Sequence, residues 1–110
     1  MPGKFEIKKA KNGQFHFNLK AGNGEIILSS EMYKTKRNTR KGIESVQKNS
    51  PEEKRYDRRK SRNGKPYFVL KARNHQPIGK SEMYETPRAM ENGIKSVKKN
   101  GSTTRIEEAN

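Results

Sequence analysis

Two segments of the chain alternate apolar and polar residues in a way that predicts a pair of equivalent strands. The apolar positions are Phe15, Phe17, Leu19 and Ala21 in the first segment and Pro66, Phe68, Leu70 and Ala72 in the second. Side chains of a strand point alternately to its two faces, so each segment is expected to bury one face and expose the other. A preceding strand is predicted at about 4–11 and at about 55–62, and a short third strand around Ile27 and Ile78.

Asn-Gly pairs separate the first strand from the second in both copies, at 12–13 and at 63–64. This pair predicts a tight type I′ hairpin, because both central residues of that turn need positive φ. Further turns are expected at 22–24 and 73–75, ahead of the third strand.

A helix is predicted after the third strand, and its buried side is best marked in the second copy. Met90, Ile94 and Val97 are spaced by four and three residues, which places them on one stripe of a helix. Gly93 lies beside this stripe and is expected to let the helix approach the sheet, since glycine otherwise costs about 1 kcal/mol of helix propensity relative to alanine.

The ends of this helix also carry recognisable signals. Thr86 is expected to cap the first turn, and Pro87 suits the first helical position because no N–H is needed there. At the other end, Asn100-Gly101 is expected to supply a left-handed stop. The first copy ends in a similar way at 48–51.

The two copies form a tandem duplication without gaps. Residues 56–101 align with residues 5–50 at a fixed offset of 51, and 21 of the 46 aligned positions are identical. The predicted fold class is α+β, with two β-β-β-α repeats forming one antiparallel six-stranded sheet and two helices on one face. The expected organisation is a first repeat at 1–53, a second repeat at 54–101 and a flexible C-terminal tail at 102–110.

The shared motifs resemble those of the YegP-like family of small bacterial proteins. They are an Asn-Gly turn, F-x-L-K-A, S-E-x-Y and a helix with G-I-x-S-V-x-K-N, spread over about residues 4–101 of both copies. The resemblance implies a β(3)-α fold, as tandem repeats or dimers, in which each C-terminal helix packs across onto the other unit. The resemblance supplies no biochemical activity and no catalytic residues that could be carried over to this chain. Met32 and Met83 depart from it, because a glycine is common at their position.

Composition narrows the choice of function. Only 27% of the 110 residues are hydrophobic and 35% are charged, so a thin core is expected. The absence of cysteine excludes disulfides, thiolate catalysis and cysteine zinc or iron–sulfur sites. The sequence shows neither the apolar run of a signal peptide nor a membrane-spanning segment, and a cytoplasmic location is expected.

The net charge is +14, shared equally by the two halves. Such a charge favours polyanionic partners such as nucleic acid or an acidic membrane surface. The alternative is that the excess of lysine serves only to keep a small protein soluble.

No enzymatic activity, cofactor or metal site is predicted. The two histidines, His16 and His75, are not at equivalent positions and form no H-x-x-H pair, so each is interpreted as a solvated side chain. Glu31 and Glu82 occupy the one aligned position at which both copies carry the same acidic residue. We expect them to pair with lysine or to accept backbone N–H groups before the helix, although a role in acid–base chemistry stays open.

Basic residues are concentrated at 54–62, with six bases and one acid, and at 34–41, with five bases and no acid. If the helices cover one face of the sheet, strand parity predicts that the other face carries both basic side chains and aromatic rings. The basic side chains could attract phosphates, and the rings could stack on unpaired nucleobases. The candidate residues for binding single-stranded nucleic acid or another polyanion are Lys8, His16, Lys20, Arg58, Arg59, Lys60, Arg62, Tyr67 and Lys71. The simpler reading is an ordinary solvated face.

The first functional hypothesis is therefore a small basic binding module that acts on nucleic acid without catalysis. The alternative is a protein-interaction or stress-associated accessory protein with no nucleic-acid role. A monomer is expected, because the duplication already supplies an internal pseudo-dimer.

Overall fold

Each repeat folds as three strands followed by a helix, as predicted. The computed structural model describes residues 3–109 of the chain. The first repeat contains β1 (Lys4–Lys9), β2 (Phe15–Lys20), β3 (Ile26–Ser30) and α1 (Lys36–Asn49). A 3-10 turn at Glu53–Arg55 leads into the second repeat, which contains β4 (Tyr56–Lys60), β5 (Pro66–Lys71), β6 (Pro77–Lys80) and α2 (Pro87–Asn100). A last strand, β7 (Ile106–Ala109), follows.

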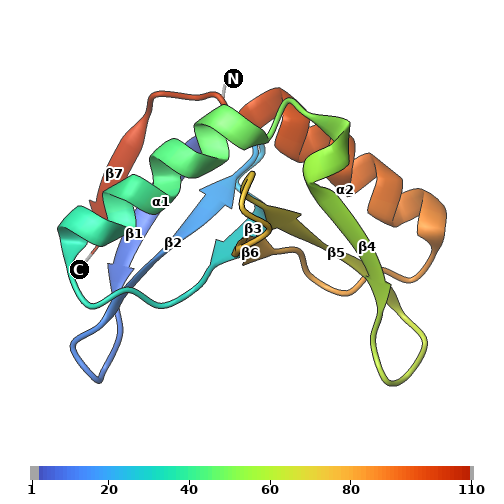
Figure 1. Cartoon of the computed structure of the whole chain (residues 1–110), viewed down its shortest axis with the longest axis horizontal. Coiled ribbons are helices and arrows are strands. Elements are labelled where there is room, and N and C mark those ends of the chain that lie inside the picture. The colour runs from blue at the N-terminus through green and yellow to red at the C-terminus, as the bar shows by residue number, and fades with distance from the viewer. Residues whose placement is uncertain (1–2, 110) are drawn as a thin grey trace.

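All strands join one sheet in the order β4-β5-β6-β3-β2-β1-β7. The repeats meet where β3 pairs with β6, through Ser29 opposite Lys80 and Ser30 opposite Gly79. Both helices lie on the same face of the sheet, and their C-terminal ends converge above the seam between the repeats (Figure 1). The predicted fold class is thus confirmed in outline, but the sheet has seven strands rather than six.

The core lies between the helices and the sheet, around two equivalent aromatic groups. Phe17 stacks on Tyr33 with ring centroids 6.3 Å apart, and Phe68 stacks on Tyr84 at 6.4 Å. The fully buried side chains include Phe5, Ile7, Leu19, Leu28, Ile43, Val46, Leu70, Ile94 and Val97. Helix α1 contacts β2 of its own repeat as well as β5 and β6, and α2 contacts β5 as well as β2 and β3. The helices therefore bridge both repeats instead of being exchanged between them.

The C-terminal segment overturns one prediction. Residues 102–110 were expected to be flexible, yet Ile106–Ala109 form β7, which pairs in parallel with β1. The Phe5 amide donates to the Arg105 carbonyl at 2.9 Å, and Glu107 binds Lys4 at 2.8 Å. Without this strand, β1 would expose a row of unpaired backbone groups at the edge of the sheet.

The Asn-Gly hairpins are also built differently from the prediction. Gly13 has a φ of 85° and Gly64 a φ of 83°, but neither asparagine has positive φ, so the turns are not type I′. In the first turn the Gly13 amide donates to the Ala10 carbonyl at 3.0 Å, and the Asn12 side chain accepts from the Gln14 amide at 3.0 Å. Asparagine serves here as a side-chain acceptor, and glycine alone supplies the left-handed conformation.

The helix starts match the prediction and one helix end does not. Thr86 accepts a hydrogen bond from the Ala89 amide at 3.0 Å, and Thr35 caps α1 in the same way. Gly101 has a φ of −68°, which is right-handed, so it is no left-handed stop. Its lack of a side chain has another reason: an added Cβ would lie 2.6 Å from Cβ of Ser50, at the point where the two helix ends meet.

Candidate nucleic-acid interface

Strand register gathers six of the nine predicted residues on the face of the sheet that the helices leave uncovered. We call this the open face. Lys8 lies opposite His16 on β1 and β2, and Arg59 lies opposite Tyr67 on β4 and β5. Lys20 of β2 and Lys71 of β5 also lie on the open face, because their neighbours Leu19 and Leu70 point into the core.

In the first repeat the open-face lysines surround one carboxylate. Glu6 lies 3.0 Å from the Lys20 amine and 3.6 Å from the Lys8 amine. The hydrogen bond from Lys20 is the main reason why the pKa of Glu6 is lowered from its ordinary value, and Lys8 adds to the effect. We call Glu6, Lys8, His16 and Lys20 the first cluster.

The second repeat repeats this arrangement at the equivalent positions. Asp57 lies 2.8 Å from Arg59 and 3.1 Å from Lys71. The hydrogen bond from Arg59, followed by that from Lys71, lowers the pKa of Asp57. Asp57, Arg59, Tyr67 and Lys71 form the second cluster. Each cluster therefore keeps two cations around one carboxylate, with a ring beside them.

Lys80 lies between the two clusters and was missed by the sequence analysis. It pairs across the strands with Ser29 on one side and Val69 on the other, at the seam of the repeats. Strand parity could not have identified it, because alternation counted from the buried Ile78 places Lys80 on the helix side. An irregularity in the register between Leu70 and Lys71 shifts the pairing, and Lys80 comes to lie opposite Val69 on the open face.

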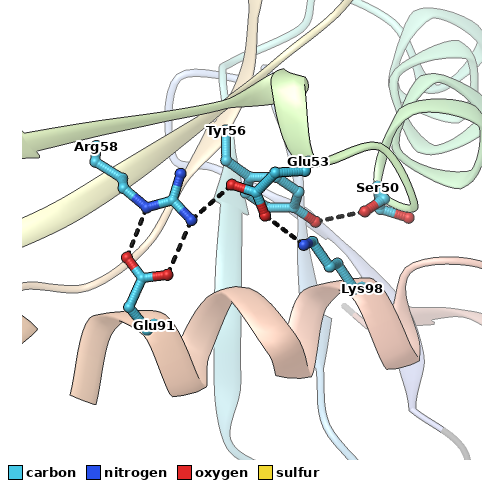
Figure 2. Close-up of polar contacts among 6 residues, drawn as sticks. All are labelled: Ser50, Glu53, Tyr56, Arg58, Glu91 and Lys98. Atoms are coloured by element: carbon cyan, nitrogen blue, oxygen red, sulfur yellow. Dashed lines mark hydrogen bonds and ion pairs between the residues drawn. The ribbon is translucent and has the colours of Figure 1, made fainter. Parts of the chain in front are cut away.

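Arg58 does not belong to the open face. It follows the parity of the buried Tyr56 and points toward α2, where it binds both carboxylate oxygens of Glu91 at 2.6 and 2.9 Å. A further ion pair joins it to Glu53 at 2.7 Å (Figure 2). The hydrogen bonding of Arg58 to Glu91 is the largest cause of the raised pKa of Arg58. Arg58 is thus a structural clamp between β4 and α2.

Two further predicted residues lie away from the two clusters. Lys60 shares the strand parity of Arg58 and therefore points to the helix side of the sheet. Arg62 lies in the exposed turn between β4 and β5. The dense basic run at 54–62 is divided between both faces and a loop, because successive residues of a strand point in opposite directions.

The start of β4 is anchored at the point where the two repeats join. The Tyr56 hydroxyl donates to the Ser50 carbonyl at 2.7 Å, and burial raises the pKa of Tyr56. The amine of Lys98 lies 5.6 Å from the centre of the Tyr56 ring and also binds Glu53 (Figure 2). These contacts hold the linker onto α2 and fix the position of the second cluster.

The shared Ser-Glu-Met-Tyr segment is structural through its serine. The Ser30 hydroxyl accepts from the Phe17 amide at 2.9 Å, and Ser81 accepts from Phe68 at 3.0 Å. The backbone contacts that we expected of Glu31 and Glu82 are therefore made by the residue before each of them.

Glu82 does reach a hollow at the seam, with a volume of about 610 Å³, together with Glu25 and Lys80. No group of three or more histidine, cysteine, aspartate or glutamate side chains that could hold a metal ion occurs among residues 3–109. Within the same residues, no helix is long and apolar enough to cross a membrane.

Comparison with known proteins places these features in a family. A family model described as a domain of unknown function, DUF1508, matches residues 10–57 and 61–108. The protein YegP of Yersinia pestis is 61% identical over 106 residues, which are 96% of this chain and 95% of that protein.

Two solved structures have the same fold. The solution NMR structure of the UPF0339 protein of Shewanella oneidensis is 56% identical, with a TM-score of 0.92 over 98% of this chain and 92% of that one. The solution NMR structure of YegP from E. coli is 53% identical, with a TM-score of 0.93 over 98% and 93%. The chain therefore belongs to the DUF1508 family, as a member with two tandem repeats, and its resemblance to the YegP-like proteins is confirmed.

Proposed function

We propose that the open face of the sheet binds single-stranded nucleic acid without catalysing a reaction on it. The observation that carries this proposal is the repeated cluster: two cations around one carboxylate, beside the ring of His16 or Tyr67. Cationic side chains attract the phosphates of the strand and displace the counterions bound to them. An aromatic ring can stack on an unpaired nucleobase.

The carboxylates set the strength of this interaction. Glu6 and Asp57 each offset part of the charge of two cations, so each cluster retains an excess of about one positive charge at neutral pH. Lys80 adds a further cation between them. Binding is therefore expected to be weak, independent of base sequence and strongly dependent on salt.

The proposal is tested by the fluorescence anisotropy of a labelled single-stranded oligonucleotide that carries no terminal phosphate. If about four phosphates are contacted, raising the salt from about 50 to about 200 mM weakens binding by about 50-fold. An NMR titration of the same complex should shift amides of β1, β2, β4 and β5 at the clusters.

Matched charge reversals distinguish the open face from the net charge of the protein. Arg59→Glu with Lys71→Glu should abolish binding, whereas Lys41→Glu with Lys95→Glu, at exposed helical positions, should lower it only slightly. Equal losses in the two double variants, or no binding at about 50 mM salt, would show that the open face is not a nucleic-acid site.

A protein partner is the second candidate function, and the edge of the sheet favours it. Strand β4 is the last strand at its end of the sheet, whereas β1 is covered by β7. A free edge can accept a strand from another protein through backbone hydrogen bonds. Slowed amide exchange in β4 on addition of a captured partner, with no binding of oligonucleotide, would favour this function over the first.

A further inference from the structure

A basic pocket lies at the edge of the second repeat, beside the second cluster. Its volume is about 260 Å³, and its charged or polar lining residues are Lys54, Arg55, Asp57, Lys71 and His75. We call it the edge pocket. It is formed where the linker enters β4 next to the turn that connects β5 and β6.

The charge around the edge pocket is not balanced by the protein. Its cations and their neighbours are Lys54, Arg55, Arg59 and Lys71, against the carboxylates of Glu52 and Asp57. These groups leave an excess of about two positive charges. A phosphate dianion carries two negative charges and would neutralise this excess.

Arg55 is the residue whose pairing is least complete. It is only 9% exposed, and within residues 3–109 its guanidinium has one contact with a carboxylate, at 3.4 Å to Glu52. Its Nε atom is buried without a hydrogen-bond partner among the described residues. A guanidinium removed from water with so few acceptors favours the approach of an anion, because buried donors that lack partners are costly.

His75 enters the pocket from a backbone conformation that favours glycine. Its φ is 68°, and the corresponding position of the other three turns is glycine, with φ between 83° and 85°. A non-glycine residue there costs of the order of 1 kcal/mol. The turn alone gives no reason for the imidazole, which adds a ring N–H donor to the wall of the pocket.

The equivalent edge of the first repeat carries other residues, although the fold is the same. Gly3, Lys4, Lys20 and Gly24 stand at the positions of Lys54, Arg55, Lys71 and His75. Lys4 is paired with Glu107, and the Thr103 hydroxyl donates to the Gly3 carbonyl at 2.8 Å. The C-terminal segment thus occupies the edge that is open in the second repeat.

We propose that the edge pocket binds a phosphate group, either as free phosphate or a small phosphomonoester or as the terminal phosphate of a nucleic-acid strand. The Arg55 guanidinium and the Lys54 and Lys71 amines supply charge, and His75 supplies a directed donor. The site goes beyond the proposed function, which needs only phosphodiesters along the open face.

The test is an NMR titration of the full chain with inorganic phosphate, at an ionic strength held constant with chloride. Amides at 54–57 and 71–76 should shift, and those at 3–6 and 20–25 of the first repeat, which serve as an internal control, should not. His75→Gly should weaken phosphate binding by about threefold and Arg55→Gln by at least about tenfold. Lys71→Gln should also weaken binding, and its matched control Lys20→Gln should not.

The glycine variant separates binding from folding. His75→Gly restores the residue that the other turns carry, so its stability should rise while its affinity for phosphate falls. Equal shifts in both repeats, or unchanged affinity in both His75→Gly and Lys71→Gln, would overturn the proposal.

Two oligonucleotides that differ only in a 5′-phosphate identify the source of the ligand. If the phosphorylated strand binds more tightly, and His75→Gly removes this difference, the edge pocket binds the ends of strands. If the two strands bind equally and inorganic phosphate also binds, the edge pocket binds small phosphates. His75→Gly should leave binding of the unphosphorylated strand unchanged. If the protein binds the unphosphorylated strand but not phosphate, only the proposal for the edge pocket is wrong. If it binds phosphate but not the unphosphorylated strand, only the proposal for the open face is wrong.

Discussion

Gly42 and Gly93 are the residues at which each helix lies against an aromatic ring. A Cβ added at Gly93 would lie 2.7 Å from Cζ of Tyr84, and one added at Gly42 would lie 2.8 Å from Cζ of Tyr33. Gly93 was expected to let the helix lie close to the sheet as a whole. In the structure this space is filled by the ring of one tyrosine in each repeat, Tyr33 or Tyr84, which stacks on the central phenylalanine.

We predict that Gly93→Ala lowers the free energy of unfolding by about 1–2 kcal/mol, because overpacking of the Tyr84 ring outweighs the gain in helix propensity. Urea denaturation measures the change. Asn92→Ala, at an exposed position of the same helix, is the control and should be neutral or stabilising. A stabilised Gly93→Ala would show that the Tyr84 ring can move aside.

Strand β7 is the element whose loss should be easiest to detect. Glu107 binds Lys4, and Glu108 binds both Lys36 and Arg40 of α1. Reversing both charges, in Glu107→Lys with Glu108→Lys, should release the strand and remove the protection of the Phe5 amide from hydrogen exchange. Glu44→Lys with Glu85→Lys makes the same change of net charge elsewhere and should leave Phe5 protected. Retained protection in the first variant would mean that β7 is held mainly by Ile106 and its backbone.

The sequence does contain a signal for β7, although the gap-free alignment conceals it. Arg105-Ile106-Glu107 repeats the basic, apolar, acidic order of Lys4-Phe5-Glu6 and Arg55-Tyr56-Asp57. The third occurrence follows the second after 50 residues, whereas the second follows the first after 51. Three residues at a shifted spacing are too few to identify from periodicity alone. The family model gives the further indication, because its first match ends in β4 and its second match ends in β7.

Strand parity explains which parts of the candidate site could be predicted. It placed Lys8, Lys20 and Lys71 on the open face, because apolar residues alternate in the sequence of β1, β2 and β5. Arg59 follows in the same way from the buried Tyr56 at the start of β4. Parity also places Glu6 beside Lys8 and Asp57 beside Arg59, two residues apart on one strand. The pairs of Glu6 with Lys20 and of Asp57 with Lys71 could not be predicted in this way, since they depend on cross-strand register. The clamp formed by Arg58 depends on the position of α2, which no local pattern contains.

The whole molecule is expected to unfold as one unit, since each helix contacts strands of both repeats. Ile43→Val and Ile94→Val, at equivalent buried positions, should each lower the free energy of unfolding by about 1 kcal/mol. Each variant should lower the protection of the slowest-exchanging amides in both repeats by the same amount. Lower protection in only the repeat that carries the substitution would mean that the two halves unfold separately.

Acid should destabilise the whole molecule through its ion-paired carboxylates. The carboxylates with lowered pKa are those of Glu6, Glu53, Asp57, Glu91, Glu107 and Glu108. A carboxylate whose pKa is lower in the folded state stabilises that state above its unfolded pKa, about 3.9 for Asp and 4.3 for Glu, and loses this effect as the pH falls further. The double variant Glu6→Gln with Asp57→Asn should give a shallower fall of the thermal midpoint between about pH 5 and pH 3, and Glu44→Gln should not.

Strand β7 also joins the two ends of the described chain. Phe5 pairs with Ile106, so both repeats lie between the two partners of this contact along the sequence. Such a contact closes a long loop, and closing it becomes favourable only after the repeats inside the loop have folded. Docking of β7 is therefore expected to be a late step in folding, which makes the pair of β1 and β7 a reporter of the completed sheet.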